Sequence, residues 1–201
     1  MRRKFTLFIL TIMFSAVMSI PAFACVGKTL IIGAVNRPDM NTMSQMLAIL
    51  INERTGTTVV SKSFNSFPAL MEAMKNGKID IMLDYSGRCY IDVLGEKPER
   101  NAEKVFSTVK DIYQRDKNQI WLPPFGFSEK GVITGNCGAT PAVAAPIMRK
   151  STLEKFPALP RVLEKLAGKI NNATIIRLTT ESSHGNAKEI TRKFLKKNRL
   201  I

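Results

Sequence analysis

The sequence holds few residues of the types that carry out catalysis. The one histidine among the 201 residues, His184, lies in the polar stretch 182–185, which is typical of a surface loop before the last helix. Neither a paired Cys/His metal spacing nor a glycine-rich phosphate-binding loop is present. We therefore predict a non-catalytic protein, without a metal or cofactor, whose chemistry is that of binding.

The N-terminus has the parts of a secretory signal peptide. Residues 1–4 are basic, residues 5–20 are apolar, and Ala22 and Ala24 supply the small side chains that a signal peptidase reads. An uncleaved membrane anchor is the weaker alternative, because the apolar run is shorter than the ~20 residues that span a bilayer. We expect residues 1–24 to be removed and the mature chain to reach the periplasm or another place outside the cytoplasmic membrane.

The three cysteines are interpreted in that exported setting. Cys25 directly follows the predicted cleavage point and could be lipidated, although Ala22 and Phe23 fit ordinary cleavage better than a lipobox. Cys89 and Cys137 form an even pair, which in an oxidising compartment could be a disulfide. Two unpaired thiols are the alternative.

The chain is strongly basic, with a formal net charge of +14. Removing Arg2, Arg3 and Lys4 leaves +11. Such an excess favours anionic surfaces, but an exported protein seldom meets nucleic acid, so we predict no nucleic-acid partner. Much of the charge lies between 188 and 199, where a solvated helical face is the simpler explanation than lipid binding.

The first half of the mature chain alternates between strands and helices. Apolar, β-branched runs predict strands over 28–33, 57–63 and 79–83. Between them lie a helix capped by Asn41 or Thr42 and ended by Gly56, and a helix capped by Ser66 and stopped at 76–77. Strands at such short intervals imply parallel pairing with right-handed crossovers. The fold class is therefore α/β.

The second half adds helices and two extended segments. We expect a short helix over 84–94, an amphipathic helix over 102–116 and a strand over 120–122. Segments 131–134 and 143–149 read as antiparallel strands joined by a turn-rich loop. The remainder is predicted to be helical over 152–156, 160–167, 173–180 and 188–197.

Several motifs, in order, resemble the substrate-binding proteins of glycine betaine/choline/proline ABC importers, the osmoprotectant or quaternary-ammonium family. Residues 79–87 (IDIMLDYSG) are similar to the family's strand that ends in E-Y-T-G. Residues 121–127 (WLPPFGF), 144–149 (AAPIMR) and 152–159 (TLEKFPAL) match later segments. The resemblance implies a type II periplasmic-binding fold with a central, mostly parallel sheet and flanking helices.

The family has two lobes, the second inserted between two hinge strands of the first. Here the segment between the predicted hinge strands, 135–140, is too short for a domain and suits a hairpin loop. We expect residues 25–201 to form a single lobe in which a hinge-derived β-hairpin, 131–149, replaces the second lobe.

The resemblance also implies ligand contacts, beginning with an aromatic cage for a quaternary ammonium. Tyr85 carries over as a cage residue, with strand-end packing as the alternative. Asp84 and Ser86 replace the family's Glu and Thr, and Arg88 replaces a small polar residue and would repel an ammonium but could pair with a carboxylate or phosphate. The predicted cleft comprises segments 34–39, 65–67 and 84–88, and its other predicted contacts are Asn36, Ser66 and Phe67. Helix capping is the alternative role for Ser66, and core packing is the alternative for Phe67.

Two functions follow. The first is a periplasmic solute-binding component that takes a quaternary amine or related zwitterion and works with an ABC permease/ATPase complex. The second is an accessory or protein-interaction module that kept the lobe fold and lost transport. Half a cleft leaves one side of a small ligand in water, and a homodimer could rebuild it.

Overall fold

A computed structural model describes residues 29–129 and 139–201. The predicted signal peptide, Cys25, Cys137 and the predicted strand 131–134 lie outside these residues. The described part is built around a five-stranded sheet of order β2-β1-β3-β5-β4. Its strands are β1 (Thr29–Val35), β2 (Thr58–Phe64), β3 (Ile81–Tyr85), β4 (Gln119–Trp121) and β5 (Ala144–Arg149).

The strand directions follow the sequence expectation. β1 pairs in parallel with both β2 and β3, whereas β5 pairs antiparallel with β3 and with β4. Within the described sheet β5 therefore runs against the other four strands, and the α/β class with a mostly parallel sheet is confirmed.

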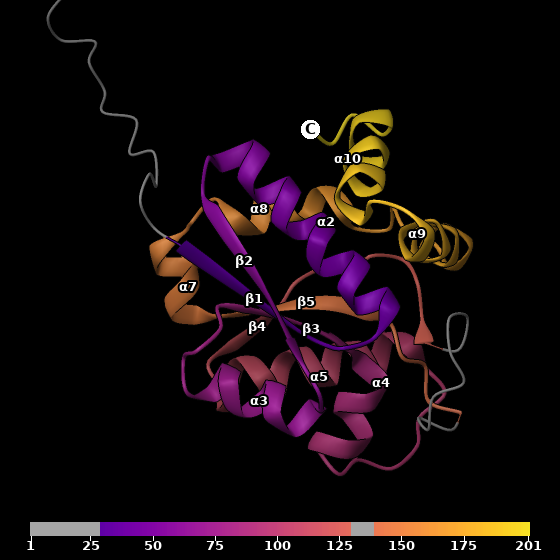
Figure 1. Cartoon of the computed structure of the whole chain (residues 1–201). Helices are drawn as coiled ribbons and strands as arrows, with labels where there is room; N and C mark the ends of the chain where they lie inside the picture. Colours follow the sequence, from indigo (N-terminus) through magenta and orange to yellow (C-terminus); the bar gives the residue numbers. More distant parts are fainter. Residues whose placement is uncertain (1–28, 130–138) are drawn as a thin grey trace, which may run out of the picture.

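Helices cover both faces of the sheet, as Figure 1 shows, with α2, α8, α9 and α10 on one face and α3, α4 and α5 on the other. The described helices are α2 (Pro38–Thr55), α3 (Phe67–Lys75), α4 (Ser86–Arg88), α5 (Ala102–Asp116), α7 (Lys150–Lys155), α8 (Leu159–Leu163), α9 (Asn172–His184) and α10 (Ala187–Lys197). A π-helical turn, Cys89–Val93, continues α4, and a 3-10 turn, Glu164–Leu166, follows α8. No helix within the described part is long and apolar enough to cross a membrane.

The alternation of side chains along β3 divides two neighbouring residues between the faces. Leu83 and Tyr85 belong to the core on the α2 side, whereas Met82 belongs to the core that α3 and α5 cover. Because successive side chains of a strand point to opposite faces, Asp84 points away from the face that Tyr85 occupies. Both are buried at the end of the same strand.

Two helix boundaries differ from the sequence prediction. α2 begins at Pro38, with Arg37 in extended conformation before it, so neither Asn41 nor Thr42 caps it. Proline suits this first position because its missing N–H would be unpaired there anyway. α9 continues to His184, which is therefore the last residue of a helix and not part of a loop.

The chain on either side of segment 130–138 runs antiparallel. Ser128 bridges to Val143, Glu129 N donates to Ala142 O at 2.9 Å, and Ala144 N donates to Phe127 O at 3.1 Å. Such pairing fits the expected hairpin. The replacement of a second lobe by this hairpin stays a prediction.

Candidate ligand-binding site

A small cavity lies where β1 and β3 end, at the edge of the sheet where open α/β folds bind their ligands. Its volume is about 180 Å³, and its lining residues are Val35, Arg37, Met40, Phe67, Leu83, Asp84, Tyr85 and Arg88. Four of the seven predicted ligand contacts, Phe67, Asp84, Tyr85 and Arg88, are among them. These four residues, which were predicted as ligand contacts, therefore lie at one cavity.

Tyr85 lies in a network of charged groups on the α2 side. Its hydroxyl donates to Asp39 Oδ2, and the edge of its ring meets Phe127 at 6.1 Å between centroids. Burial, together with the charge of Asp39, raises the pKa of Tyr85, so the hydroxyl remains a donor. The buried Asp39 is held in place by the first turn of α2.

Arg37 completes this network. Its Nε lies 3.3 Å from Asp39 Oδ1, and its Nη1 donates to Glu129 Oε1 at 2.7 Å. The guanidinium carbon also lies 5.1 Å from the centroid of the Tyr85 ring, which is within the range of a cation–π contact. Arg37 thus joins the end of β1 to a residue 92 positions later.

Asp84 forms a second buried network on the opposite face. Its Oδ1 accepts from Arg88 Nη2 and, at 2.7 Å, from the N–H of Tyr85, while its Oδ2 accepts from Cys89 Sγ at 3.1 Å. Burial raises the pKa of Asp84 to about 6, although the positive charge of Arg88 opposes the shift. The helical turn of α4 supplies the i,i+4 spacing that brings Arg88 back to Asp84.

Arg88 also stacks on Phe67. The guanidinium carbon lies 3.2 Å from the centroid of the ring. Phe67 is the first residue of α3, and the cap before it, Ser66, accepts from Ala69 N at 3.4 Å. The predicted capping role of Ser66 is therefore confirmed. The cap fixes the start of α3 and with it the position of Phe67.

The other three predicted contacts do not line the cavity. Asn36 is exposed and accepts from Asn41 Nδ2 at 2.9 Å, and Ser66 is an exposed helix cap. Ser86 is fully buried, and its Oγ accepts from Val143 N at 3.1 Å. Ser86 therefore joins the start of α4 to the segment that leads into β5.

Of the two cysteines predicted either to pair or to stay unpaired, only Cys89 lies in the described part of the chain, so the disulfide stays a prediction. Cys89 is a fully buried thiol, directed at the Asp84 carboxylate. Burial and that nearby charge raise the pKa of the thiol well above its usual value. Cys137 lies outside the described residues.

Four residues of the charged network and its ring contacts were not predicted as ligand contacts: Arg37, Asp39, Phe127 and Glu129. Arg37 and Asp39 do lie within the predicted cleft segment 34–39. The stretch Arg37-Pro38-Asp39 carried a signal, because a proline with an acidic residue behind it marks the first turn of a helix. Placing α2 there would have put Asp39 at the end of β1. No sequence pattern near Glu129 indicates its role, because its partner Arg37 is 92 residues away in the sequence.

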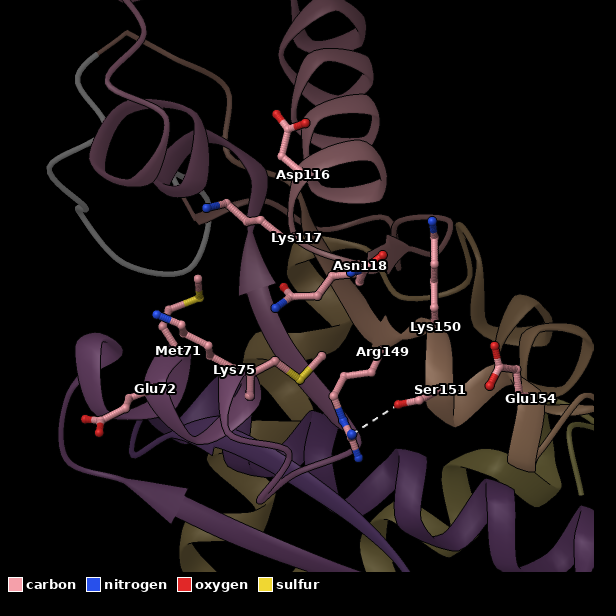
Figure 2. Close-up of a pocket in the computed structure, with 12 residues that line it drawn as sticks. Met71, Glu72, Lys75, Asp116, Lys117, Asn118, Arg149, Lys150, Ser151 and Glu154 are labelled. Carbon is pink, nitrogen blue, oxygen red and sulfur yellow. Dashed lines mark hydrogen bonds between the residues drawn. The ribbon is translucent and has the colours of Figure 1, made fainter.

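A larger hollow lies at the opposite edge of the sheet. It has a volume of about 930 Å³ and lies beside Gln119, the first residue of β4, and Arg149, the last of β5. Figure 2 shows the side chains that α3, the end of α5 and the start of α7 contribute, among them Lys75 and Lys150. None of the described residues that line it is aromatic, so it offers no ring to a quaternary ammonium.

Metal binding has no support in the described part of the chain. Between residues 29 and 129, and between 139 and 201, no group of three or more His, Cys, Asp or Glu side chains is arranged to hold a metal ion. The charged residues of the cavity instead form ion pairs: Arg88 with Asp84, and Arg37 with Asp39 and Glu129.

Comparison with known proteins agrees with this fold. The model of the OpuAC family, the substrate-binding domain of the ABC-type glycine betaine transport system, matches residues 28–134, which is more than half of the chain. The chain belongs to this family. The match includes every residue that lines the cavity.

Curated relatives of this OpuAC-family chain are distant. The carnitine transport binding protein OpuCC of Listeria monocytogenes is 25% identical over 185 residues, covering 88% of the chain and 58% of the relative. The ergothioneine transport permease/ergothioneine binding protein EgtU of Helicobacter pylori is 22% identical over 135 residues, covering 63% of the chain and 23% of the relative. The chain thus spans less than two thirds of the length of these relatives.

Solved structures show the same fold. A glycine betaine/carnitine/choline ABC transporter structure matches with a TM-score of 0.76 and 16% identity, covering 86% of this OpuAC-family chain and 98% of the other. Apo YehZ from Escherichia coli matches with a TM-score of 0.73 and 13% identity, covering 87% and 100%. At such identities the likeness supports the fold alone, and the periplasmic-binding fold expected from the sequence is confirmed.

Proposed function

We propose that this chain is a non-catalytic solute-binding component of an ABC importer and that it takes a small quaternary-ammonium or related zwitterionic solute. The observation that carries the proposal is the cavity at the ends of β1 and β3. It lies within the part of the chain that matches the OpuAC family. Phe67, Asp84, Tyr85 and Arg88 are the proposed ligand contacts.

The size of the cavity limits the solute. A volume of about 180 Å³ is below the ~300–1,000 Å³ of pockets that enclose drug-sized ligands. The solute therefore has few heavy atoms, as betaine-like compounds do. The relatives named for carnitine and for glycine betaine support the same class of solute.

The proposal extends to partners and location. We place the mature chain outside the cytoplasmic membrane, where it would deliver its solute to a permease/ATPase complex. The alternative of an interaction module without ligand is not favoured by the family match, and the comparisons give no support to a homodimer. A single lobe with a hairpin in place of the second lobe remains part of the proposal.

Isothermal titration calorimetry tests this function. The mature chain is titrated with glycine betaine, choline, carnitine and proline, each up to millimolar concentration. We expect at least one saturable isotherm of one-to-one stoichiometry. The same titrations into the chain unfolded in urea serve as the control. Absence of saturable heat across the four solutes would contradict the proposed function.

A further inference from the structure

Each aromatic side chain that lines the cavity carries a guanidinium group of the chain itself. Arg88 lies 3.2 Å from the centroid of the Phe67 ring, and Arg37 lies 5.1 Å from that of Tyr85. A cation within about 6 Å of a ring centroid gains the same electrostatic attraction that an ammonium ligand would gain. One face of each ring is therefore covered by a resident cation.

The resident cations are firmly held. Arg37 is fixed between Asp39 and Glu129, and on another side of Tyr85 the Phe127 ring packs edge-on. An ammonium that entered the cavity would approach two guanidinium groups, each of which already covers one face of Phe67 or Tyr85. Expelling an arginine would also leave its buried carboxylate partner unpaired, which is costly.

Arg88 has the spare hydrogen-bonding capacity. A guanidinium offers five N–H groups, and one of them donates, to Asp84 Oδ1, within the described part of the chain. The side chain of Arg88 is 18% exposed whereas that of Asp84 is 0% exposed. Of the two members of this ion pair, Arg88 is therefore the more accessible.

We infer that this cavity recognises the anionic end of its ligand, and that Arg88, stacked on Phe67, is the residue that binds it. The inference rests on the proposed function and narrows its ligand class to small carboxylates and carboxylate-bearing zwitterions. The carboxylate oxygens accept from the free N–H groups of Arg88 in charge-assisted hydrogen bonds. The ammonium of a zwitterion is tolerated but not caged by Phe67 or Tyr85.

Four compounds of similar shape separate the two ends of the ligand. Glycine betaine carries both charges, 3,3-dimethylbutanoate replaces its nitrogen by carbon and keeps the carboxylate, and choline and tetramethylammonium carry the cation alone. Calorimetric titration of the mature chain is expected to give saturable binding of the two carboxylates, with affinities within about tenfold of each other, and none of the two pure cations.

Variants at position 88 test the named residue. Arg88→Met is expected to weaken binding of both carboxylates by about tenfold or more, because it removes charge-assisted hydrogen bonds. Arg88→Lys keeps the positive charge and is expected to retain part of the affinity. Arg115→Met, at an exposed arginine of α5, should bind like the unaltered chain. Circular dichroism establishes that each variant is folded.

The outcomes separate this inference from the proposed function. Binding of choline or tetramethylammonium as tight as that of 3,3-dimethylbutanoate would overturn the inference and leave solute binding intact. Unchanged carboxylate affinity in a folded Arg88→Met chain would overturn the role of Arg88. Failure of glycine betaine and 3,3-dimethylbutanoate to bind would overturn the inference, whereas the proposed function is contradicted only if carnitine, proline and choline also give no saturable heat.

Discussion

Arg149 Nη2 donates to Asp80 Oδ1 at 2.6 Å and so joins the end of β5 to the residue that precedes β3. The same arginine donates from Nε to Ile79 O at 2.9 Å. The second oxygen of Asp80 accepts from Ile31 N at 2.9 Å, which brings in β1. Three adjacent strands are thus fastened at the edge of the sheet that lies away from the ligand cavity.

Breaking this ion pair is expected to destabilise the fold. In Arg149→Met the carboxylate of Asp80 keeps its main-chain donor but loses its cationic partner. Since the two side chains are only 20% and 13% exposed, the free energy of unfolding should fall by about 3 kcal/mol. Urea denaturation followed by the fluorescence of Trp121, the one tryptophan of the chain, measures the loss.

The matched control is an ion pair in water. Arg115 pairs with Asp116 at 2.8 Å, but these side chains are 71% and 49% exposed. Arg115→Met should therefore leave the free energy of unfolding almost unchanged, because exposed ion pairs contribute little. Equal losses in Arg149→Met and Arg115→Met would show that the Arg149 pair contributes no more than a surface contact.

The buried Asp84 predicts an unusual dependence of stability on pH. Its pKa in the folded chain, about 6, exceeds the 3.8 of an unperturbed aspartate. The folded state therefore binds a proton more tightly than the unfolded state. Its contribution to the free energy of unfolding increases as the pH falls from above 6 to below 4, by about 3 kcal/mol at 1.36 kcal/mol for each pKa unit.

Asp84→Asn isolates this contribution. The variant lacks the titrating group. We therefore subtract its free energy of unfolding from that of the unaltered chain, and expect this difference to increase as the pH falls from 7 to 4. Urea titrations at several pH values give that difference directly. A difference that stays constant, or that falls as the pH falls, would mean that folding does not raise the pKa of Asp84.

Much of the architecture was predictable because it depends on local patterns. The apolar runs located the first three strands, Gly56 and Ser66 marked the end of α2 and the start of α3, and the alternation along residues 81–85 implies that Asp84 and Tyr85 face opposite sides. These features depend on neighbours within a few residues. The boundaries then follow to within a turn or less, apart from the start of α2 and the end of α9.

The charge network around the cavity was not predictable in the same way. The pairing of Arg37 with Glu129 spans 92 residues, and nothing near either residue in the sequence indicates the other. A family motif carried Tyr85 over as an aromatic contact, yet a motif does not show that a guanidinium already lies on its ring. The sequence therefore predicted which residues lie at the cavity better than it predicted which contacts they make with one another.

Gly126 is expected to tolerate no side chain. Its φ is +116°, and a Cβ there would lie 3.0 Å from Gly168 Cα and 3.1 Å from Ile170 O. Gly126→Ala introduces backbone strain of ~1–3 kcal/mol and also overpacks the new methyl group against main-chain atoms. The free energy of unfolding should therefore fall by about 3 kcal/mol or more. Because Gly126 precedes Phe127, the Tyr85–Phe127 contact should also loosen.

Gly95→Ala is the control for the backbone strain alone. Gly95 has a φ of +70°, but a Cβ there meets nothing within 4 Å, so a loss of about 1 kcal/mol is expected. Chemical denaturation of both variants gives the comparison. If Gly126→Ala costs no more than Gly95→Ala, the segments around Gly126 and Gly168 are not packed as closely as described.

The buried thiol of Cys89 should be protected from modification. It has no exposed surface, donates to Asp84 Oδ2, and has a raised pKa, so the reactive thiolate is scarce at neutral pH. In a chain carrying Cys25→Ser and Cys137→Ser, we expect Ellman's reagent to react negligibly under native conditions and to label one thiol per chain in urea. The protection follows from packing between β3, the π-helical turn and α5. The rate of labelling therefore measures how firmly this packing holds the segment that also positions Arg88. Rapid labelling of the folded chain would show that this unit opens far more readily than a closed core allows.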